Sequence, residues 1–238
     1  MVPEDRKADV IQSMRRYYAA RANEYDLVYA KPERQVDIRA LQAWLPTQFS
    51  GARVLDVAAG TGFWTEHIVP VAREVVLVDA APETLAIARR RLPPAKSKFV
   101  VGDAFHLPSD LGPFDAAFVG FWFSHVPKER RRDFLLGLVG CLRPGGLAVL
   151  VDNQYVEGSN HPIGETDEAG NTYQTRQLAD GSAHSVLKNF PTSEELGEAV
   201  AGLAFETNSW ALKYYWVFTF RTARAEAPGT PPAYSSSG

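Results

Sequence analysis

The spacing of hydrophobic positions changes along the chain. In the first 50 residues apolar side chains recur at the helical period, which predicts an amphipathic helix over 4–22 and another over about 33–49. Beyond them, short apolar runs alternate with helical patterns; the runs cover 53–57, 74–79, 98–101, 114–119 and 147–152. Pro82 and Pro127 each open one of the intervening helices, and the Arg-Pro-Gly-Gly run at 143–146 stops the second. This alternation predicts a doubly wound α/β fold with a mostly parallel sheet.

The last third of the chain follows a different pattern. A helix begins near Thr192, and two β-rich runs, 204–210 and 214–220, follow with only three residues between them. A parallel crossover needs far more chain, so these two strands must be antiparallel. The sheet should therefore have seven strands, with the last one reversed. Residues 1–222 are expected to form one domain, and 223–238, rich in Pro, Gly, Ala and Ser, a disordered tail.

Residues 153–190 fit neither pattern. They contain polar, turn-rich chain and a predicted hairpin formed by 171–178 and 182–188. Inserted after the fifth strand, this segment should lie at the carboxyl edge of the sheet, where open α/β folds bind ligands. It is a cap over a substrate, or else an arm for homo-oligomerisation or a decoration without function, and the sequence does not decide between the cap and these alternatives. Residues 1–50 are expected to form a helical lid.

Composition narrows the classes of function. The net charge is −3, which disfavours a nucleic-acid binder that relies on a basic surface. No run of 18 apolar residues exists and the N-terminus lacks the apolar core of a signal peptide, so we expect a cytoplasmic protein that does not span a membrane. The single cysteine, Cys141, allows neither an intrachain disulfide nor a cysteine-based metal site, and no metal is expected.

The first predicted strand ends in an acidic residue followed by a glycine-containing turn. Gly60 and Gly62 let the backbone approach a ligand closely and turn sharply into the next helix. Asp56 stands immediately before this turn. A dinucleotide would place its anionic pyrophosphate here, where a carboxylate repels it. S-adenosylmethionine has no phosphate and carries two cationic groups, so Asp56 favours that ligand.

The next two strands also end in carboxylates. Asp79 can accept hydrogen bonds from both hydroxyls of a ribose, and Asp103 from an adenine amino group, with Ala104 or Phe105 covering the ring. Each residue alone is also explained as a helix cap. Three at successive strand ends favour an adenosine site.

Taken together, these motifs resemble the class I S-adenosylmethionine-dependent methyltransferase superfamily, in particular its ubiquinone/menaquinone-biosynthesis-like small-molecule branch. The resemblance rests on the ordered set VLDVAAGTG, LVDAAPETLAIAR, GDAFHLP, FDAAFVGFWFSHVP and LRPGGLAVLVD, and covers roughly residues 52–152. Ala58 stands where the family often has its first glycine. The family's fold is a seven-stranded sheet with a reversed last strand.

The resemblance implies a set of cofactor-binding residues. It places the methionine end of S-adenosylmethionine near Asp56, Ala58, Gly60, Thr61 and Gly62, the ribose on Asp79 with Ala80 beside it, and the adenine against Asp103, Ala104 and Phe105. Gly120 and Phe121 line the opening toward the methyl group, and Tyr18 and Tyr25 close over the cofactor as part of the lid. For the two tyrosines, packing in the core is the alternative.

The acceptor side is less clearly marked. His125 follows the fourth predicted strand and is the candidate general base, with a purely structural histidine as the alternative. Trp122 and Tyr155 are candidates for contact with the acceptor. Aromatic residues and the predicted cap favour a small, aromatic or apolar acceptor, and the sequence leaves open whether O, N or C is methylated.

Two rival functions remain. An NAD-dependent oxidoreductase shares the layered fold, but Asp56 opposes it, as does Thr65 at the third glycine position of the dinucleotide-binding turn. A non-catalytic protein that binds S-adenosylmethionine is the other, because the predicted cofactor site is better marked than any catalytic group.

Overall fold

The computed structural model describes residues 14, 17–18, 21–107, 111–178 and 181–223. Most of the predicted helix 4–22 and nearly all of the predicted tail 223–238 lie outside these residues. Met14, Tyr17 and Tyr18 are described and are helical. Tyr17 and Met14 are buried against Val186 and Leu187 of the insertion, which joins the first residues of the chain to a segment far away in sequence.

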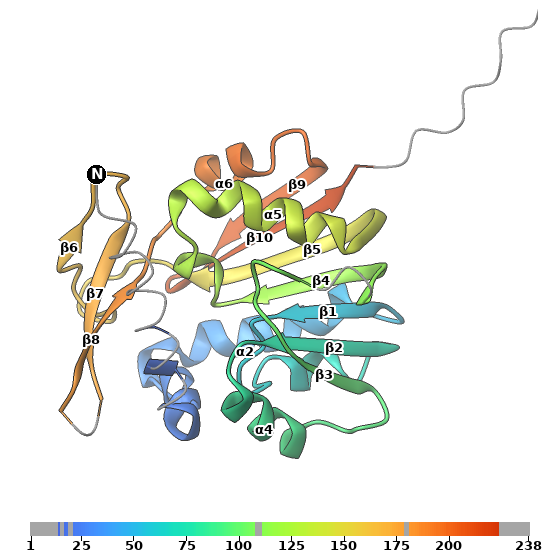
Figure 1. Ribbon diagram of the computed structural model, residues 1–238, viewed down its shortest axis with the longest axis horizontal. Coiled ribbons are helices and arrows are strands. Elements are labelled where there is room, and N and C mark those ends of the chain that lie inside the picture. The colour runs from blue at the N-terminus through green and yellow to red at the C-terminus, as the bar shows by residue number, and fades with distance from the viewer. Residues whose placement is uncertain (1–13, 15–16, 19–20, 108–110, 179–180, 224–238) are drawn as a thin grey trace, which may run out of the picture.

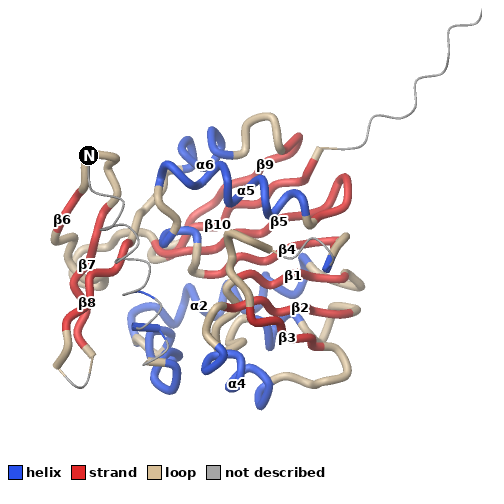
Figure 2. The backbone as a smooth tube through the Cα atoms, in the orientation of Figure 1, coloured by secondary structure: helices blue, strands red, loops and turns tan. Residues whose placement is uncertain are grey.

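The seven-stranded sheet has the order β3-β2-β1-β4-β5-β10-β9 (Figures 1 and 2). Its strands are β1 (Arg53–Val57), β2 (Glu74–Asp79), β3 (Ser97–Val101), β4 (Phe114–Gly120), β5 (Leu142–Asn153), β9 (Ala204–Ala211) and β10 (Tyr215–Thr222). β1 to β5 are parallel, and β10 runs antiparallel to both β5 and β9. The predicted fold class is confirmed. The reversed last strand lies between β5 and β9 rather than at the edge.

Helices cover both faces of this sheet. The α-helices are α2 (Gln35–Trp44), α3 (Thr65–Ile68), α4 (Pro82–Arg91), α5 (Arg131–Gly140) and α6 (Ser193–Ala199). Short 3₁₀ helices span Ala22–Tyr29, Pro32–Arg34, Leu45–Gln48, Phe123–His125 and Lys128–Arg130. Side chains of α2, α3 and α4 share one hydrophobic cluster with the sheet, and those of α5 and α6 share the other. Alternate residues of β1, β2, β4, β5 and β10 enter opposite clusters, as strands buried on both faces require, whereas the edge strand β9 is mostly exposed.

Two boundaries differ from the sequence-based expectation. The helix expected over 33–49 is three pieces, and the second of them, α2, ends before Pro46 because proline has no N–H to continue the α-helical hydrogen bonds. The run 143–146 does not stop α5, which already ends at Gly140. These residues form the irregular start of β5, where Gly145 has a φ of 76° and the pairing with β4 shifts register.

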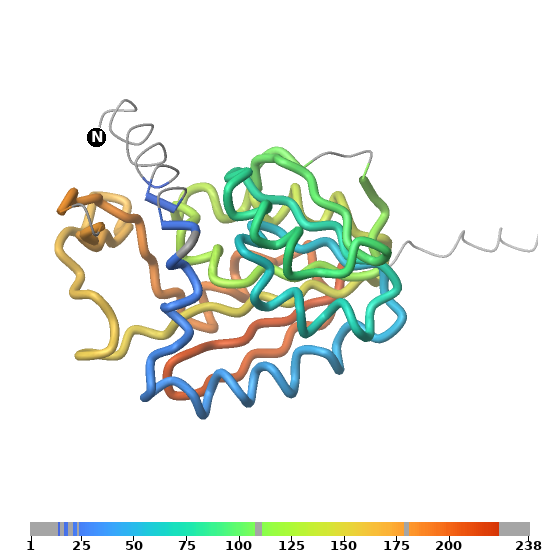
Figure 3. The backbone as a smooth tube through the Cα atoms, turned by 90° about the horizontal axis from the view of Figure 1, so that it is seen from below, coloured from blue at the N-terminus to red at the C-terminus, as the bar shows by residue number. Residues whose placement is uncertain are grey.

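The insertion forms a small sheet of its own. β6 (Glu165–Thr166), β7 (Thr172–Gln177) and β8 (Ala183–Leu187) are antiparallel, and the predicted hairpin is present as β7 and β8. This sheet lies beyond the carboxyl ends of the parallel strands (Figure 1). Seen from below, the first described residues, in blue, pass between it and the main sheet (Figure 3). In the described part of the chain, no helix is long and apolar enough to cross a bilayer.

The turn after β1 gives a test of the packing between β1 and α4. A Cβ added at Gly62 (φ 72°) would meet the side chains of Leu92 at 3.1 Å and Ala88 at 3.2 Å, whereas Gly51 (φ 68°) has nothing within 4 Å. Gly51→Ala should lower the free energy of unfolding by about 1–2 kcal/mol through backbone strain alone. Gly62→Ala should lose a further ~1–3 kcal/mol through overpacking. Urea unfolding measures both, and equal losses would contradict the predicted contact.

Candidate active site

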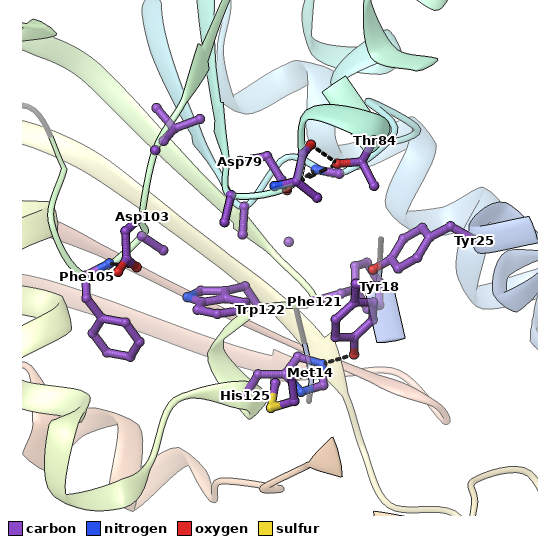
Figure 4. Close-up of a pocket in the computed structure, with 18 of the residues that line it drawn as sticks. Met14, Tyr18, Tyr25, Asp79, Thr84, Asp103, Phe105, Phe121, Trp122 and His125 are labelled. Carbon is purple, nitrogen blue, oxygen red and sulfur yellow. Dashed lines mark hydrogen bonds between the residues drawn. The ribbon is translucent and has the colours of Figure 1, made fainter. Parts of the chain in front are cut away.

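A cavity of about 370 Å³ lies at the carboxyl ends of β1 to β4. Thirteen of the residues predicted for the site line it: Tyr18, Tyr25, Ala58, Gly60, Asp79, Ala80, Asp103, Ala104, Phe105, Gly120, Phe121, Trp122 and His125. In the close-up, Asp79 and Asp103 lie on different sides of the cavity, and the Trp122 ring lies below both (Figure 4). Residues chosen from four separate motifs therefore meet around one space.

Asp79 both lines this cavity and holds the backbone around it. One carboxylate oxygen accepts from the Gly60 N–H at 2.8 Å, and the other from the Ala81 N–H at 2.8 Å and the Thr84 hydroxyl at 3.1 Å. It thus fixes the turn after β1 and the start of α4 together. The role of a cap, weighed as the alternative for this residue, is one it does perform.

The turn itself has an unusual backbone. Ala58, Gly60 and Gly62 have φ values of 55°, 56° and 72°, in the left-handed region that favours glycine. Ala58 takes this conformation with a side chain, at a cost of about 1–2 kcal/mol. Such strain is typical of backbone that must approach a ligand closely.

Asp56 is buried below this turn. Its side chain is 2% exposed, accepts a hydrogen bond from the Thr65 hydroxyl at 2.5 Å, and forms no ion pair with any residue that the structure describes. Burial raises the pKa of Asp56 to about 7. The residue lines a pocket of about 20 Å³ directly under Ala58 and Gly60. An uncompensated carboxyl group at this point favours a cationic ligand group above it.

At the other end of the cavity, Asp103 holds the loop after β3. Its carboxylate accepts from the Phe105 N–H at 3.0 Å and contacts His106 Nδ1 at 3.3 Å. The Arg130 guanidinium lies 3.9 Å from the centre of the Phe105 ring, which it covers. This end combines a carboxylate, an aromatic ring and a cation, a set able to contact a flat heterocycle.

His125 is buried between the main cavity and the insertion. Its Nδ1 lies 2.6 Å from the Leu187 carbonyl oxygen, so Nδ1 carries the proton and donates it. Nε2 then accepts from the Tyr18 hydroxyl at 2.9 Å (Figure 4). Burial, together with the cations of Lys188 and Arg176, holds the pKa of His125 well below its ordinary value. The imidazole is therefore neutral at neutral pH, with its basic nitrogen directed at Tyr18.

Besides Asp56, three predicted residues do not line the main cavity. The Thr61 hydroxyl donates to Asp26 at 2.6 Å, and the residue lines the small pocket beside Asp56. Gly62 faces α4, as described above. Tyr155 packs edge-on against Phe190, with ring centres 5.2 Å apart, and lines none of the cavities described here, so its predicted contact with the acceptor gains no support.

A second cavity of about 190 Å³ adjoins the first. Tyr18, Tyr25, Phe121 and His125 line both. The rest of its wall comes from the first 34 residues, the insertion and Tyr215, and includes five cationic side chains: Arg21, Lys31, Arg34, Arg176 and Lys188. The two cavities meet at Phe121, which was predicted beside the methyl group, at the two predicted lid tyrosines and at the candidate base His125.

Several residues of this region were missed in the sequence. Met14 lines the main cavity, and Arg34 and Arg176 line the second. Asp152 and Lys188 form a buried ion pair at 2.9 Å beside His125. Asp152 could have been found in the sequence, because it stands near the end of its strand as the three predicted aspartates do. No sequence pattern marks Arg34, Arg176 and Lys188, because these residues come together only in the folded chain.

Comparisons with known proteins agree with this geometry. The family model described as "Methyltransferase domain" matches residues 54–146. The ubiquinone/menaquinone biosynthesis C-methyltransferase UbiE of Azotobacter vinelandii is 30% identical in an alignment 173 residues long that covers 66% of this chain and 66% of that protein. A solved structure described as "DhpI-SAH complex structure" has a TM-score of 0.72 and 28% identity, over 90% of this chain and 97% of that one.

The chain belongs to the class I S-adenosylmethionine-dependent methyltransferases. Another relative, the demethylmenaquinone methyltransferase of Clavibacter sepedonicus, is 36% identical over 104 residues, 43% of this chain and 42% of that protein. The chain thus spans 66% of the length of the first of these relatives and 42% of the second. The expected family is thus confirmed for this methyltransferase, and the roles of individual residues remain predictions.

The buried carboxyl group of Asp56 gives a pH-dependent test. In the unfolded chain an aspartate loses its proton near pH ~4, whereas folded Asp56 keeps it up to about pH 7. Between these values the folded state binds more protons, so its stability falls as pH rises. An asparagine at this position would not titrate and can still accept from Thr65. Relative to wild type, Asp56→Asn should gain ~1–3 kcal/mol of unfolding free energy between pH 5 and pH 8. Urea unfolding of the ligand-free protein at both pH values measures this, and a pH-independent difference would contradict it.

Proposed function

We propose that this chain transfers a methyl group from S-adenosylmethionine to a small molecule, with the donor in the larger cavity and the acceptor in the second. The observation that carries the proposal is the shared wall: Tyr18, Tyr25, Phe121 and His125 line both cavities. Two ligands seated on either side of these residues would meet there. Bringing two reactants together in a fixed geometry can supply ~7–11 kcal/mol of a reaction barrier.

The larger cavity fits the methyl donor in size and in chemistry. Asp56 and the turn at Ala58 and Gly60 would face its cationic methionine end, Asp79 its ribose, and Asp103 with Phe105 its adenine. The donor supplies a methyl carbon that its positive sulfur has already activated toward in-line displacement. The chain then has to bind, align and exclude water.

Aromatic side chains support the exclusion of water. Phe121 has a φ of 61°, an unusual backbone for a bulky residue, and its ring stacks on Trp64 with centres 5.4 Å apart. Tyr29 and Tyr215 contact the same ring edge-on at 5.3 and 5.4 Å. This packing holds Phe121 at the junction of the two cavities, where a strained backbone conformation is typical of a functional position. The rings offer a dry surface for a sulfonium group.

An acceptor that must lose a proton would use Tyr18 and His125 together. The Tyr18 oxygen would take the proton from the methyl acceptor while the proton of the Tyr18 hydroxyl passes to His125 Nε2. Nε2 is free to receive it because the other ring nitrogen, Nδ1, carries the imidazole proton and donates it to the Leu187 carbonyl. His125 is then the general base, acting through Tyr18 rather than directly on the acceptor.

We also propose that the insertion is a substrate cap. Leu187 orients His125, and Asn153, Ser159, His161, Gln174 and Arg176 contribute to the wall of the second cavity. An oligomerisation arm would have no need to supply this wall. Membership of the methyltransferase family disfavours the first rival function, an NAD-dependent oxidoreductase. A measurement of turnover distinguishes the second, a protein that binds S-adenosylmethionine without activity, from an enzyme.

The first test concerns the methyl donor. Asp79→Ala should weaken binding of S-adenosylhomocysteine at least tenfold, because each charge-assisted hydrogen bond to a ribose contributes ~1.5–3 kcal/mol. It should also destabilise the fold, since Asp79 holds Gly60 and Ala81. Asp115→Ala is the matched control: Asp115 accepts from the Arg53 N–H at 2.7 Å, at the opposite end of the sheet.

Titration calorimetry on both folded variants measures the affinities. Equal affinity in the two variants would remove Asp79 from the donor site. Tight binding of NAD in place of S-adenosylhomocysteine would overturn the whole proposal.

The second test concerns the proton. In the protein without ligands, the pKa of His125 lies well below its ordinary value of 6.5, so the neutral imidazole prevails from pH 6 to pH 8. For a hydroxyl acceptor, kcat/KM should therefore show no ionisation of a histidine in this range. Tyr18→Phe should lower kcat by ~10²–10⁴-fold with donor affinity preserved. A wild-type profile that rises through pH 6–7, or a Tyr18→Phe variant within a few-fold of wild type, would reject the relay.

A further inference from the structure

The second cavity is strongly basic in a chain whose net charge is −3. Five cationic side chains line it, and none of the lining residues is Asp or Glu. Lys188 is neutralised by Asp152. Arg21, Lys31, Arg34 and Arg176 form no ion pair with any residue in the described part of the chain. Exposed Glu33, whose carboxylate accepts from the Ser159 hydroxyl at 2.8 Å, offsets part of the charge of Lys31 and Arg34. Buried Arg176 has no carboxylate within ion-pair distance in the described part of the chain, so this space favours an anionic ligand.

Arg34 is held as a fixed donor rather than as a mobile surface charge. It is 5% exposed, and its Nε and Nη2 donate to the hydroxyl and carbonyl oxygens of Ser159 at 3.0 and 3.2 Å. Nη1 donates to Asn153 Oδ1 at 2.8 Å. All these partners are neutral. They orient the guanidinium while leaving its positive charge available to the cavity.

Arg176 approaches the same space from β7. Its Nη2 donates to Gln174 Oε1 at 3.0 Å and its Nη1 to the Tyr18 hydroxyl at 3.5 Å. Its Nε is buried and has no hydrogen-bond partner in the described structure. Leaving such a buried charged donor unpaired is unfavourable, and an oxyanion that accepts from it would remove that cost.

Lys31 completes the group. Its ammonium donates to the Ser159 carbonyl at 2.5 Å. Burial lowers the pKa of Lys31, the charge of Arg34 lowers it further, Glu33 opposes the shift and Arg176 adds to it. Lys31 thus stands close enough to Arg34 and Arg176 for the three positive charges to act on one ligand group in the cavity.

We propose that the methyl acceptor carries an oxyanion, a carboxylate or a phosphoryl group, which Arg176, Arg34 and Lys31 hold while the methylated atom lies at the junction with the donor cavity. This inference rests on the proposed methyl transfer and names the class of its acceptor. It revises the apolar acceptor expected from the sequence, because the aromatic residues lie at the junction and the cations behind it. Planar guanidinium groups suit both kinds of oxyanion.

The donor's own carboxylate is the competing explanation for these charges. That carboxylate belongs to a ligand that we place in the larger cavity, whose wall includes neither Arg34, Arg176 nor Lys31. The experiment must nevertheless separate the two ligands.

The experiment titrates the protein, saturated with S-adenosylhomocysteine, with acetate, inorganic phosphate or neutral acetamide at constant ionic strength. At least one anion should bind with 1:1 stoichiometry, and acetamide should not. The anion that binds more tightly decides between a carboxylate and a phosphoryl group. Arg176→Gln should weaken anion binding at least tenfold and leave S-adenosylhomocysteine binding within about threefold. Arg89→Gln is the matched control, since Arg89 is exposed on α4 and lines neither cavity.

Each failure has a distinct meaning. Failure of S-adenosylhomocysteine to bind would overturn the proposed function itself. Normal binding of S-adenosylhomocysteine with no anion bound, or with acetamide bound equally well, would overturn only the anionic acceptor. A loss of S-adenosylhomocysteine affinity in Arg176→Gln, with anion binding kept, would assign the cations to the donor. If Arg176→Gln does not fold, Lys31→Gln, at the edge of the same group, carries the same expectations.

Discussion

The buried ion pair between Asp152 and Lys188 fixes the arrangement on which the rest of the site depends. Its charged atoms lie 2.9 Å apart, with side chains 0% and 5% exposed. Lys188 also donates to the Ser124 hydroxyl at 2.5 Å, and Asp152 accepts from the Ser124 N–H at 2.9 Å. The pair thus joins the end of β5, the turn after β4 and the end of the insertion. Removing one partner of such a pair typically costs ~3–5 kcal/mol because it leaves the other charge buried and unpaired, so this arrangement needs both residues.

The contacts around this ion pair position the other side chains of the site. His125 directly follows Ser124, and Leu187 directly precedes Lys188, so the contact between Ser124 and Lys188 brings His125 against the Leu187 carbonyl. This carbonyl sets the tautomer of His125 and directs its Nε2 at Tyr18. Tyr18 belongs to the wall between the two cavities, with acidic strand ends on one side of it and arginines on the other. The opposite charges of the two sides match a cationic donor and an anionic acceptor, and place the neutral aromatic rings between them.

Much of the fold was predictable because it is encoded locally. β1 and β2 begin and end where their buried runs do, and Thr192 caps α6 as its side chain predicts, accepting from the Glu195 N–H. The start of β5 was not predictable, because residues 143–146 read as a turn and belong to the strand only as an irregular stretch between Leu142 and Leu147, which both pair with β4. The acidic strand ends were found since parallel strands bring them to one edge. Arg34 and Arg176 were not, because they are 142 residues apart and meet only through the insertion.

The central claim is that donor and acceptor occupy adjoining cavities and meet at Tyr18, Tyr25, Phe121 and His125. A crystal structure of the protein with S-adenosylhomocysteine tests it most directly. The account predicts the adenine near Asp103 and Phe105 and the sulfur nearest the four shared side chains, with the basic cavity still open to an acceptor. S-adenosylhomocysteine lying in the basic cavity, or with its sulfur turned away from this junction, would contradict the account.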